Sequence, residues 1–480
     1  MDPRITRRSF FHRAADGIYG AALLSILGKD VYGSEPSVAG PRSYDLRPRP
    51  PHFGPKARAV IQLFQNGGPS QVDLFDPKPA LDRFHGQPVY DQIAADVSSP
   101  QSAGGLLRSP FTFARYGKAG TWLSDALPEL RRHVDDIAVI RSMFNVHPNH
   151  EPALYKIHSG QVLPGLPTIG AWVVYGLGTV NQNLPAYVVL DDPLGLPVNG
   201  VQSWQAGYLP PIYQGTRLRS TGSPLLNLHP DVERPNEVVR LQQDLLARLD
   251  RIHQQQRPHQ LQLEARIASY ELAARMQLEA TDALDLNQES RATLEAYGVG
   301  REPTDSYARR CLMARRLVER GVRYVQIFIN GQIWDNHNRL ESSLRSACVR
   351  TDKPVSALLD DLKQRGLLES TLVIWGGEFG RLPIAQFPAG GDVSNAGRDH
   401  GPRGFSLWMA GAGIKGGVTH GATDDIGYAA VENRVSVADW HATILHLLGL
   451  HHEELFFERN GFRDKLTSTF PARVVREILA

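Results

Sequence analysis

Cysteine is scarce in this chain, since Cys311 and Cys348 are its only two. No pair has zinc-finger spacing, and two cysteines do not make a disulfide framework. Both lie in segments that we expect to be helical. Two buried thiols are therefore favoured over a single bridge between them.

The chain also lacks a large excess of positive or of negative charge. The chain has 52 Lys and Arg residues against 50 Asp and Glu residues, which leaves a net charge of +2. This balance gives no sign of the basic surface by which proteins bind nucleic acids, so no nucleic-acid partner is expected. Hydrophobic residues make up 42% and charged residues 21%, which is typical of a globular protein.

The N-terminus resembles an export signal. Residues 6–12 read TRRSFFH, with the pair Arg7 and Arg8 of a twin-arginine motif, and the apolar run IYGAALLSIL follows at 18–27. That run falls short of the roughly 20 apolar residues that span a bilayer, so no stable membrane span is expected. We predict that residues 1–35 direct export by the twin-arginine route to the periplasm or cell surface. The alternative is a basic N-terminal helix.

The rest of the chain alternates predicted strands and helices. A linker is expected at 36–56, one domain at 57–450, and an extension of that domain at 451–480. Strands are predicted at 57–64, 136–142, 186–190, 322–329, 371–375 and 405–410, and helices at 149–159, 169–175, 306–319, 340–364 and 437–448. This order predicts an α/β fold with a mostly parallel central sheet and helices on both faces. Gln, Glu, Arg, Leu and Ala dominate about 235–285, where we predict a helical insertion.

Acidic and histidine side chains adjoin three of these strands. Asp335 and His337 follow one strand, Glu378 follows the next, and His400 stands beside Asp399 just before a third. Reactive groups of α/β sheets gather at the carboxyl ends of strands. A mixture of carboxylates and imidazoles there suits a divalent metal. The alternative is that these are ordinary turn and surface-loop residues.

Arg381 lies three residues beyond Glu378. It is predicted either to pair with that carboxylate or to bind an anionic substrate through two parallel hydrogen bonds.

The order of these motifs is similar to that of the alkaline phosphatase/sulfatase superfamily. It comprises Asn-Gly-Gly at 66–68, WDNH at 334–337, GEFGR at 377–381, RDH at 398–400 and DWHATILHLLGL at 439–450. More closely, the chain resembles the exported sulfatase-like family known as domain of unknown function 1501, from about Arg58 to Ala480. The resemblance implies an alkaline phosphatase-like fold with metal at the carboxyl edge of the sheet.

Carried over to this sequence, the resemblance makes Asp335, His337 and His400 one metal subsite. Glu378 takes the place of an Asp in the second subsite, and Phe379 takes that of a His. The bound ions implied are one or two of zinc, calcium, magnesium or manganese.

Two further positions bear on the second subsite. Asn66 stands where the family has an acid after the first strand, so it is assigned to substrate binding. Asp73 is the candidate that replaces the missing acid as a metal ligand.

The segment 149–160 resembles the one that carries the nucleophile in sulfatases. Because helix N-termini favour anions, His147, Asn149 and His150 are predicted to bind a phosphate or sulfate group. His150, Glu378 and Arg381 are the candidate catalytic residues. Alternatively, metal-bound water attacks without a protein nucleophile, or the two histidines only hydrogen-bond a loop. The chain lacks the Cys-x-Pro-x-Arg motif, which argues against a formylglycine-dependent sulfatase.

These residues support two hypotheses from different classes. The first is a metal-dependent hydrolase of phosphate or sulfate esters, with an anionic ester or a sulfated glycan as substrate. The second is a non-catalytic sulfatase-like protein that binds surface glycans or protein partners; the sequence names no such partner. Asp439 and His441 are expected to be a helix cap and a packing residue rather than ligands.

Overall fold

The computed structural model describes residues 45–220, 235–257, 260–387 and 395–480. The predicted export signal lies outside these ranges. Residues 44–480 form one compact unit, and residues of the expected linker join it, since His52 N donates to Gly449 O at 2.9 Å. No helix in the described ranges combines the length and apolar character needed to cross a membrane.

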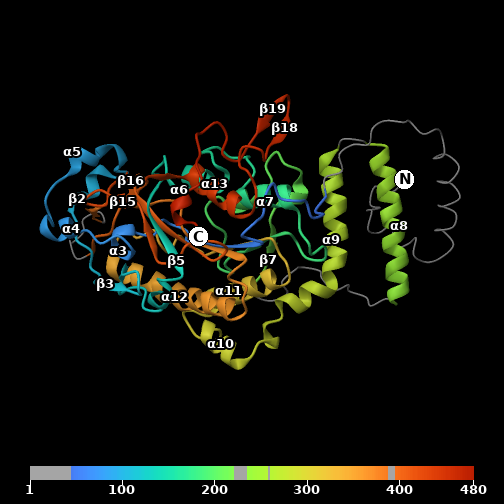
Figure 1. Cartoon of the computed structure of the whole chain (residues 1–480), viewed down its shortest axis with the longest axis horizontal. Helices are drawn as coiled ribbons and strands as arrows, with labels where there is room; N and C mark the ends of the chain where they lie inside the picture. The colour runs from blue at the N-terminus through green and yellow to red at the C-terminus, as the bar shows by residue number, and fades with distance from the viewer. Residues whose placement is uncertain (1–44, 221–234, 258–259, 388–394) are drawn as a thin grey trace, which may run out of the picture. The chain divides into compact units, whose positions relative to one another are not determined.

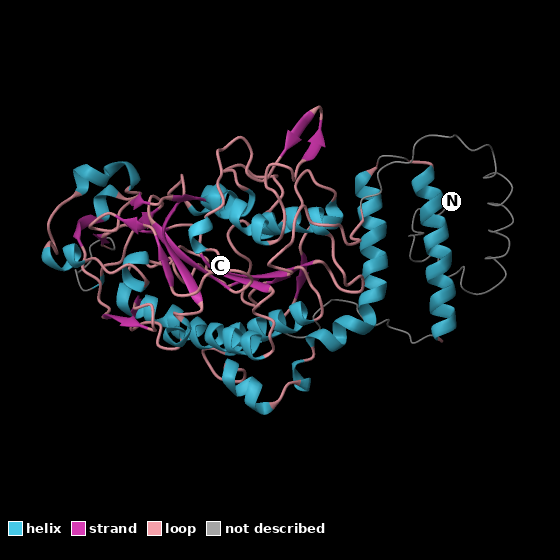
Figure 2. Cartoon of the chain, viewed as in Figure 1, coloured by secondary structure: helices cyan, strands magenta, loops and turns pink. Residues whose placement is uncertain are grey.

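A nine-stranded sheet forms the centre of this unit (Figure 2). Its strand order is β14-β5-β13-β9-β1-β8-β6-β7, and β17 also pairs with β5. The strands are β1 (Ala59–Phe64), β5 (Ile137–Phe144), β6 (Tyr187–Leu190), β7 (Thr216–Leu218), β8 (Tyr324–Phe328), β9 (Thr371–Gly376), β13 (Phe405–Ala410), β14 (Val418–His420) and β17 (Val435–Ser436). β13 runs antiparallel to both of its neighbours, β5 and β9. The other described pairings in this sheet are parallel.

Helices cover both faces of the sheet (Figure 1). On one face lie α11 (Asp305–Glu319) and α12 (Leu340–Gln364), and on the other lie α6 (His150–Ser159), α7 (Ile169–Leu177) and α13 (Val437–Leu447). The alternation of side chains along β1 explains this arrangement. Ile61 and Leu63 belong to the core beneath α11 and α12, whereas Val60 and Phe64 belong to the core on the other face.

The fold class predicted from the sequence is confirmed. Every predicted strand and helix is present, with ends that shift by two residues or fewer. The sequence did not predict the reversed direction of β13 or the short edge strands β7 and β14. The start of α13 is a capping box, in which Ser436 and Asp439 exchange side-chain-to-backbone hydrogen bonds. The expected roles of Asp439 as a cap and of the wholly buried His441 as a packing residue are thus confirmed.

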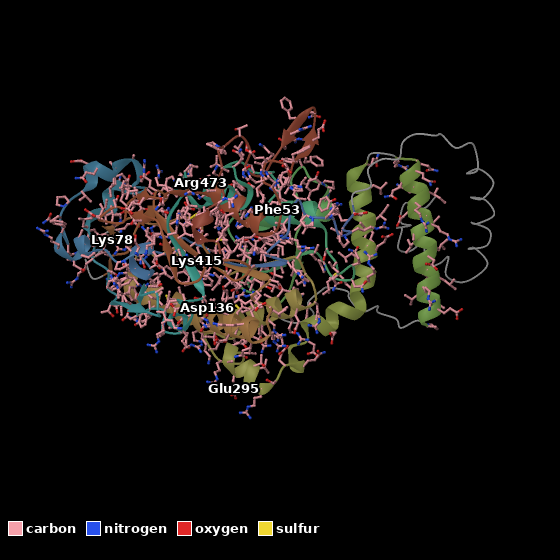
Figure 3. The ribbon with its side chains drawn as sticks, in the orientation of Figure 1. Phe53, Lys78, Asp136, Glu295, Lys415 and Arg473 are labelled. Atoms are coloured by element: carbon pink, nitrogen blue, oxygen red, sulfur yellow. The ribbon has the colours of Figure 1, made fainter. Side chains whose placement is uncertain are left out.

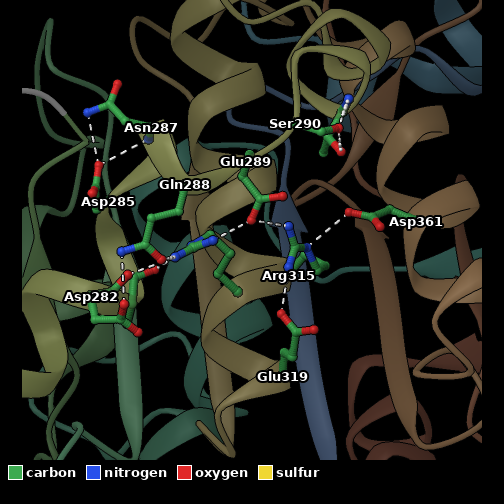
Figure 4. A network of polar contacts seen from close by, with 12 residues as sticks. Asp282, Asp285, Asn287, Gln288, Glu289, Ser290, Arg315, Glu319 and Asp361 are labelled. Atoms are coloured by element: carbon green, nitrogen blue, oxygen red, sulfur yellow. Dashed lines mark hydrogen bonds and ion pairs between the residues drawn. The ribbon is translucent and has the colours of Figure 1, made fainter.

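The segment expected to be a helical insertion contains α8 (Asn236–Gln255) and α9 (Leu261–Leu284). The end of α9 is fixed to α11 because Arg316 Nε donates to Ala283 O at 2.9 Å. Beside it, the buried Arg315 forms ion pairs with Glu289 at 2.6 Å and with Asp361 of α12 at 2.9 Å (Figure 4). These charges join α11 and α12 to the chain that returns from the insertion.

Smaller elements surround the sheet. They are α3 (Gln71–Leu74), α4 (Pro79–Arg83), α5 (Tyr90–Ile93), α10 (Arg291–Tyr297), and the antiparallel pairs β2 (Ala103–Leu106) with β11 (Ile384–Gln386), β3 (Phe113–Tyr116) with β4 (Thr121–Ser124), β10 (Gly380–Arg381) with β12 (His400–Gly401), β15 (Ala422–Thr423) with β16 (Ala430–Glu432), and β18 (Phe457–Arg459) with β19 (Phe462–Asp464).

The two cysteines are buried and free, as expected. Acidic and basic side chains are interspersed over the surface, as Glu295 and Arg473 illustrate (Figure 3). This mixture accords with the net charge near zero.

Candidate metal centre

One edge of the sheet gathers the candidate ligands. Parallel strands β8 and β9 end there, so the loops that follow them carry Asp335 and Glu378 to that edge. β5 ends there too and leads into α6, which begins at His150. β13 runs the opposite way, so its beginning lies at this edge. That reversal brings His400, five residues before the strand, beside the others.

Four side chains form a cluster: His150, Asp335, His337 and His400. Each offers one possible ligand atom, and these atoms lie within 4.8 Å of one another. Asp335 is central, with Oδ1 2.8 Å from His337 Nε2 and 3.1 Å from His400 Nε2. Its Oδ2 lies 3.3 Å from His150 Nε2. Three imidazole nitrogens and a carboxylate therefore face a common point.

Oxygen acceptors hold the far nitrogens of two of these rings. His150 Nδ1 lies 2.6 Å from Glu378 Oε1, and His337 Nδ1 contacts Gln386 Oε1. An amide or carboxylate oxygen can only accept, so Nδ1 of each ring is the donor. Whenever such a ring is neutral, its Nε2 carries the lone pair and faces the cluster. Metal-binding histidines are commonly oriented in this way.

Glu378 lies behind His150 and outside the four-residue cluster. Its side chain is wholly buried, and Gly67 N donates to Oε1 at 3.0 Å. Asn145 Nδ2 fixes its backbone by donating to Glu378 O at 2.8 Å. From the sequence, Glu378 was expected to be both a metal ligand and a catalytic residue. In the structure its carboxylate instead orients the ring of His150.

Arg381 is enclosed by the protein rather than facing a substrate. Its guanidinium donates to Gly67 O and Gly68 O and forms an ion pair with Asp335 Oδ1 at 2.6 Å. The remaining nitrogen donates to Arg398 O. Because each of the three nitrogens already donates to a protein oxygen and the side chain is buried, the guanidinium is not presented to a substrate for two parallel hydrogen bonds. The chemical role that this geometry supports is to hold the carboxylate of Asp335.

Asp73 does not join the cluster. Its carboxylate forms two hydrogen bonds with Arg398, at 2.7 and 3.1 Å, and both side chains are wholly buried. Ser70 Oγ donates to the same carboxylate. The carboxylate of Asp73 thus belongs to a structural ion pair with Arg398. In this arrangement Asp73 does not supply the metal ligand that was expected to compensate for Asn66.

Asn66 and the glycines after it form a tight turn beside the cluster. Asn66 is buried, and neither polar atom of its side chain has a hydrogen-bond partner. Gly67 has φ +109°, and a Cβ there would lie 2.7 Å from Asp335 N. Only glycine therefore allows this turn to approach the loop of Asp335 so closely.

Phe379 occupies the other side of the cluster. Its buried ring lies 4.9 Å from the ring of His150 and 4.8 Å from that of His400, between centroids. An apolar ring contributes no ligand, so this side offers nothing to a second ion. In the described part of the chain, the four-residue cluster is the one group of potential ligands of this kind.

The predicted anion-binding residues divide between the cluster and the preceding loop. His150 is the first residue of α6 and belongs to the cluster. Asn149 is the N-cap of α6, but its side chain makes no capping hydrogen bond. Its backbone N donates to His147 Nδ1 at 3.1 Å, so His147 orders the loop before the helix.

The pKa values of the cluster diverge. Burial alone would lower the pKa of His150, but hydrogen bonds to Asp335 and Glu378 outweigh it and raise that pKa to about 9. Burial lowers the pKa of His400 to about 4 despite its contact with Asp335. For Asp335, burial is outweighed by three imidazoles and Arg381, which hold its pKa well below the usual range. The cluster thus keeps an ionised carboxylate beside a neutral imidazole at neutral pH.

Two features of the site had little or no signal in the sequence. Gln386, which holds His337, lies in a short strand 49 residues away, and nothing in its sequence neighbourhood marks it. Asp399 precedes His400 in the sequence, but its carboxylate contacts backbone nitrogens rather than the imidazole ring. Its Oδ2 accepts from Ser98 N at 2.8 Å, and its Oδ1 accepts from the backbone N of His400.

The fold and the cluster define an α/β protein with a candidate divalent-metal centre at the carboxyl edge of a mostly parallel sheet. The family described as "Protein of unknown function (DUF1501)" matches residues 57–479, and the chain belongs to this family. No curated protein sequence matches it.

Solved structures that resemble the chain include sulfatases and phosphatases. The sulfatase PsFucS1 from Pseudoalteromonas sp. is 11% identical, with a TM-score of 0.33 over 82% of this chain and 68% of that one. The phosphonate monoester hydrolase SpPMH from Silicibacter pomeroyi is 12% identical, with a TM-score of 0.33 over 74% and 71%. The alkaline phosphatase of the Antarctic bacterium TAB5 is 9% identical, with a TM-score of 0.29 over 74% and 92%.

Proposed function

We propose that this protein is a metal-dependent hydrolase of phosphate or sulfate esters. The observation that supports it is the convergence of His150, Asp335, His337 and His400 with ligand atoms within 4.8 Å of one another. A set of three imidazoles and one carboxylate matches the ligands that zinc takes in proteins. Magnesium, manganese and calcium favour more oxygen atoms than this set supplies.

The buried atoms without partners also fit a bound ion. Neither polar atom of the Asn66 side chain, which lies beside the cluster, makes a hydrogen bond. Leaving buried polar groups unpaired is costly, and a bound ion or its water is one partner that would relieve that cost. Because Phe379 supplies no ligand, we propose one ion rather than two.

Substrate would approach from the side of Asp335 and His337. Their side chains are 20% and 32% exposed, more than those of His150 and His400. The first turn of α6 lies beside this opening and favours a negative charge. A divalent ion here would lower the pKa of water and offset the charge of an ester anion. Arg381 and Glu378 would keep Asp335 and His150 in place.

Export is part of the proposal. Arg7, Arg8 and the apolar run at 18–27 support the twin-arginine route to the periplasm or cell surface. That route carries folded proteins, so an ion would be acquired before export.

The test combines metal analysis with a substrate screen. Purified protein should contain about one ion per chain, and His337→Ala should lose it, whereas His451→Ala, which removes an exposed histidine elsewhere, should keep it. The loaded protein is then assayed on phosphate monoesters, phosphate diesters and sulfate esters. If it holds an ion but turns over none of them, the non-catalytic binding protein replaces the hydrolase.

A further inference from the structure

Exposed apolar side chains concentrate beside the candidate metal centre. Fifteen large apolar side chains are exposed among the described residues, and four of them fall within eight consecutive positions. These are Leu194, Leu196, Val198 and Val201, at 41–78% exposure. Val146, which is 60% exposed, lies in the loop that leads into α6. We call these five residues the apolar rim.

Hydrogen bonds attach the rim to elements that carry the cluster. Asn199 Nδ2, within the rim segment, donates to Glu151 O at 2.9 Å, one residue after His150. Asn145, next to Val146, donates to Glu378 O at 2.8 Å. The rim is thus fixed to the first turn of α6 and to the strand end that orients His150.

The rim also adjoins the loop of Asp335. A Cβ added to Gly195 would lie 3.1 Å from Asn330 Oδ1, so the rim segment packs closely on the residues that follow β8. These residues lead directly to Asp335. A substrate bound at the cluster therefore has the rim as a neighbouring surface.

The charges of this segment argue against a polyanion or an anionic membrane as its occupant. Residues 191–204, DDPLGLPVNGVQSW, contain no Lys or Arg. Their two acids are neutralised from elsewhere, Asp191 by Arg217 and Asp192 by Arg310. Recognition of a sulfated glycan or an anionic lipid surface requires cations. Contiguous exposed apolar side chains instead bind apolar groups.

We propose that the substrate is amphiphilic: its anionic ester group binds at the cluster and its alkyl chain lies on the apolar rim. This inference rests on the proposed hydrolase and narrows its substrate class. Because the rim segment is attached to the first turn of α6 and packs on the residues after β8, one molecule could contact both the rim and the cluster. The alkyl chain would be covered on one side only. Each methylene would therefore raise the affinity by less than the roughly fourfold that full burial gives.

The first experiment measures kcat/KM for n-alkyl phosphates and n-alkyl sulfates from methyl to octyl, below their micellar concentrations. We expect a rise of about twofold per methylene, since about half of the chain is buried. The combined variant Leu194→Ser, Leu196→Ser and Val198→Ser should lower the octyl-to-methyl ratio at least tenfold. Phe462→Ser, which removes a 73% exposed ring from the β18–β19 hairpin, should leave that ratio unchanged.

A second measurement separates this inference from the hydrolase. Binding of octylphosphonate and methylphosphonate, which are not hydrolysed, is measured on the metal-loaded protein. A preference for octylphosphonate that the combined variant removes supports the rim even if no ester is turned over. Turnover or binding without chain-length dependence overturns it. One further outcome would also overturn it: turnover that does not depend on chain length, together with binding to phosphatidylcholine vesicles that the combined variant abolishes. In that case the rim would bind a lipid surface rather than the alkyl chain of the substrate.

Discussion

Glu378 Oε1 lies 2.6 Å from His150 Nδ1, although 228 positions separate the two residues in the chain. Glu378 is wholly buried and follows β9, whereas His150 opens α6 and turns its other nitrogen toward Asp335. The carboxylate thereby fixes both the orientation of the imidazole and the ring nitrogen that faces the cluster. Such an outer partner commonly strengthens metal binding.

Removing the negative charge of Glu378 should weaken metal binding while leaving all four cluster residues in place. For Glu378→Gln we expect a metal affinity about 10–100-fold lower, as for other partners of ligating histidines. Competition with a chromogenic chelator measures it. Glu454→Gln is the matched control, because Glu454 faces His52 at 3.8 Å on the surface. Equal affinity in Glu378→Gln and wild type would contradict the orienting role.

Arg381 should act on turnover through Asp335. Arg381→Lys keeps the charge but not the planar fork that joins Gly67, Gly68 and Asp335, so the carboxylate loses its fixed position. We expect turnover of the best ester to fall by about 10²–10³, the usual effect of losing an electrostatic group of an active site.

The control for that variant is Asp439→Ala. It breaks the capping box of α13 and should cost about 1 kcal/mol of stability without changing turnover. If Arg381→Lys lowers the free energy of unfolding as much as Asp439→Ala does yet keeps full turnover, Arg381 is only a structural residue.

Acid should destabilise the fold through two buried histidines outside the cluster. Burial lowers the pKa values of His158 and His441 to about 3, from 6.5 in the unfolded chain. Their contribution to stability is therefore complete above pH 6.5 and is lost as the pH falls toward 3. The free energy of unfolding should decrease by about 1.4 kcal/mol per pH unit for each ring in this window.

Urea unfolding at several pH values between 7 and 4 measures that slope. His158→Leu should reduce the slope by the contribution of one histidine, about 1.4 kcal/mol per pH unit, although the variant itself is less stable at pH 7. His451→Ala, an exposed histidine, should leave the slope unchanged. A wild-type slope near zero would mean that these rings are protonated in the folded protein.

Replacing Arg7 and Arg8 together with lysine should retain the protein in the cytoplasm, because the proposed export signal depends on the twin-arginine pair. Fractionation of cells that express both forms measures this. Normal export of the lysine variant would reject the twin-arginine route.

The fold was predictable because its main strands are short apolar runs and its main helices repeat apolar residues at helical spacing. The position of Asp335 and Glu378 at one edge followed from the parallel strands before them. The strand pattern alone did not place His400, because a short apolar run such as β13 carries no signal of its direction; its place beside Asp335 was predicted only from the family resemblance. The partners of Arg381 were not predictable either, since backbone carbonyls at 67 and 68 bind it, and the sequence shows only side chains.

The four cluster residues span the chain from residue 150 to residue 400. In an unfolded chain they are dispersed, so an ion that needs all of them binds the folded state alone. At a free ion concentration 100 times the dissociation constant, such binding adds about 2.7 kcal/mol to the free energy of unfolding. The melting temperature of this protein thus reports which ion it prefers, with no substrate required.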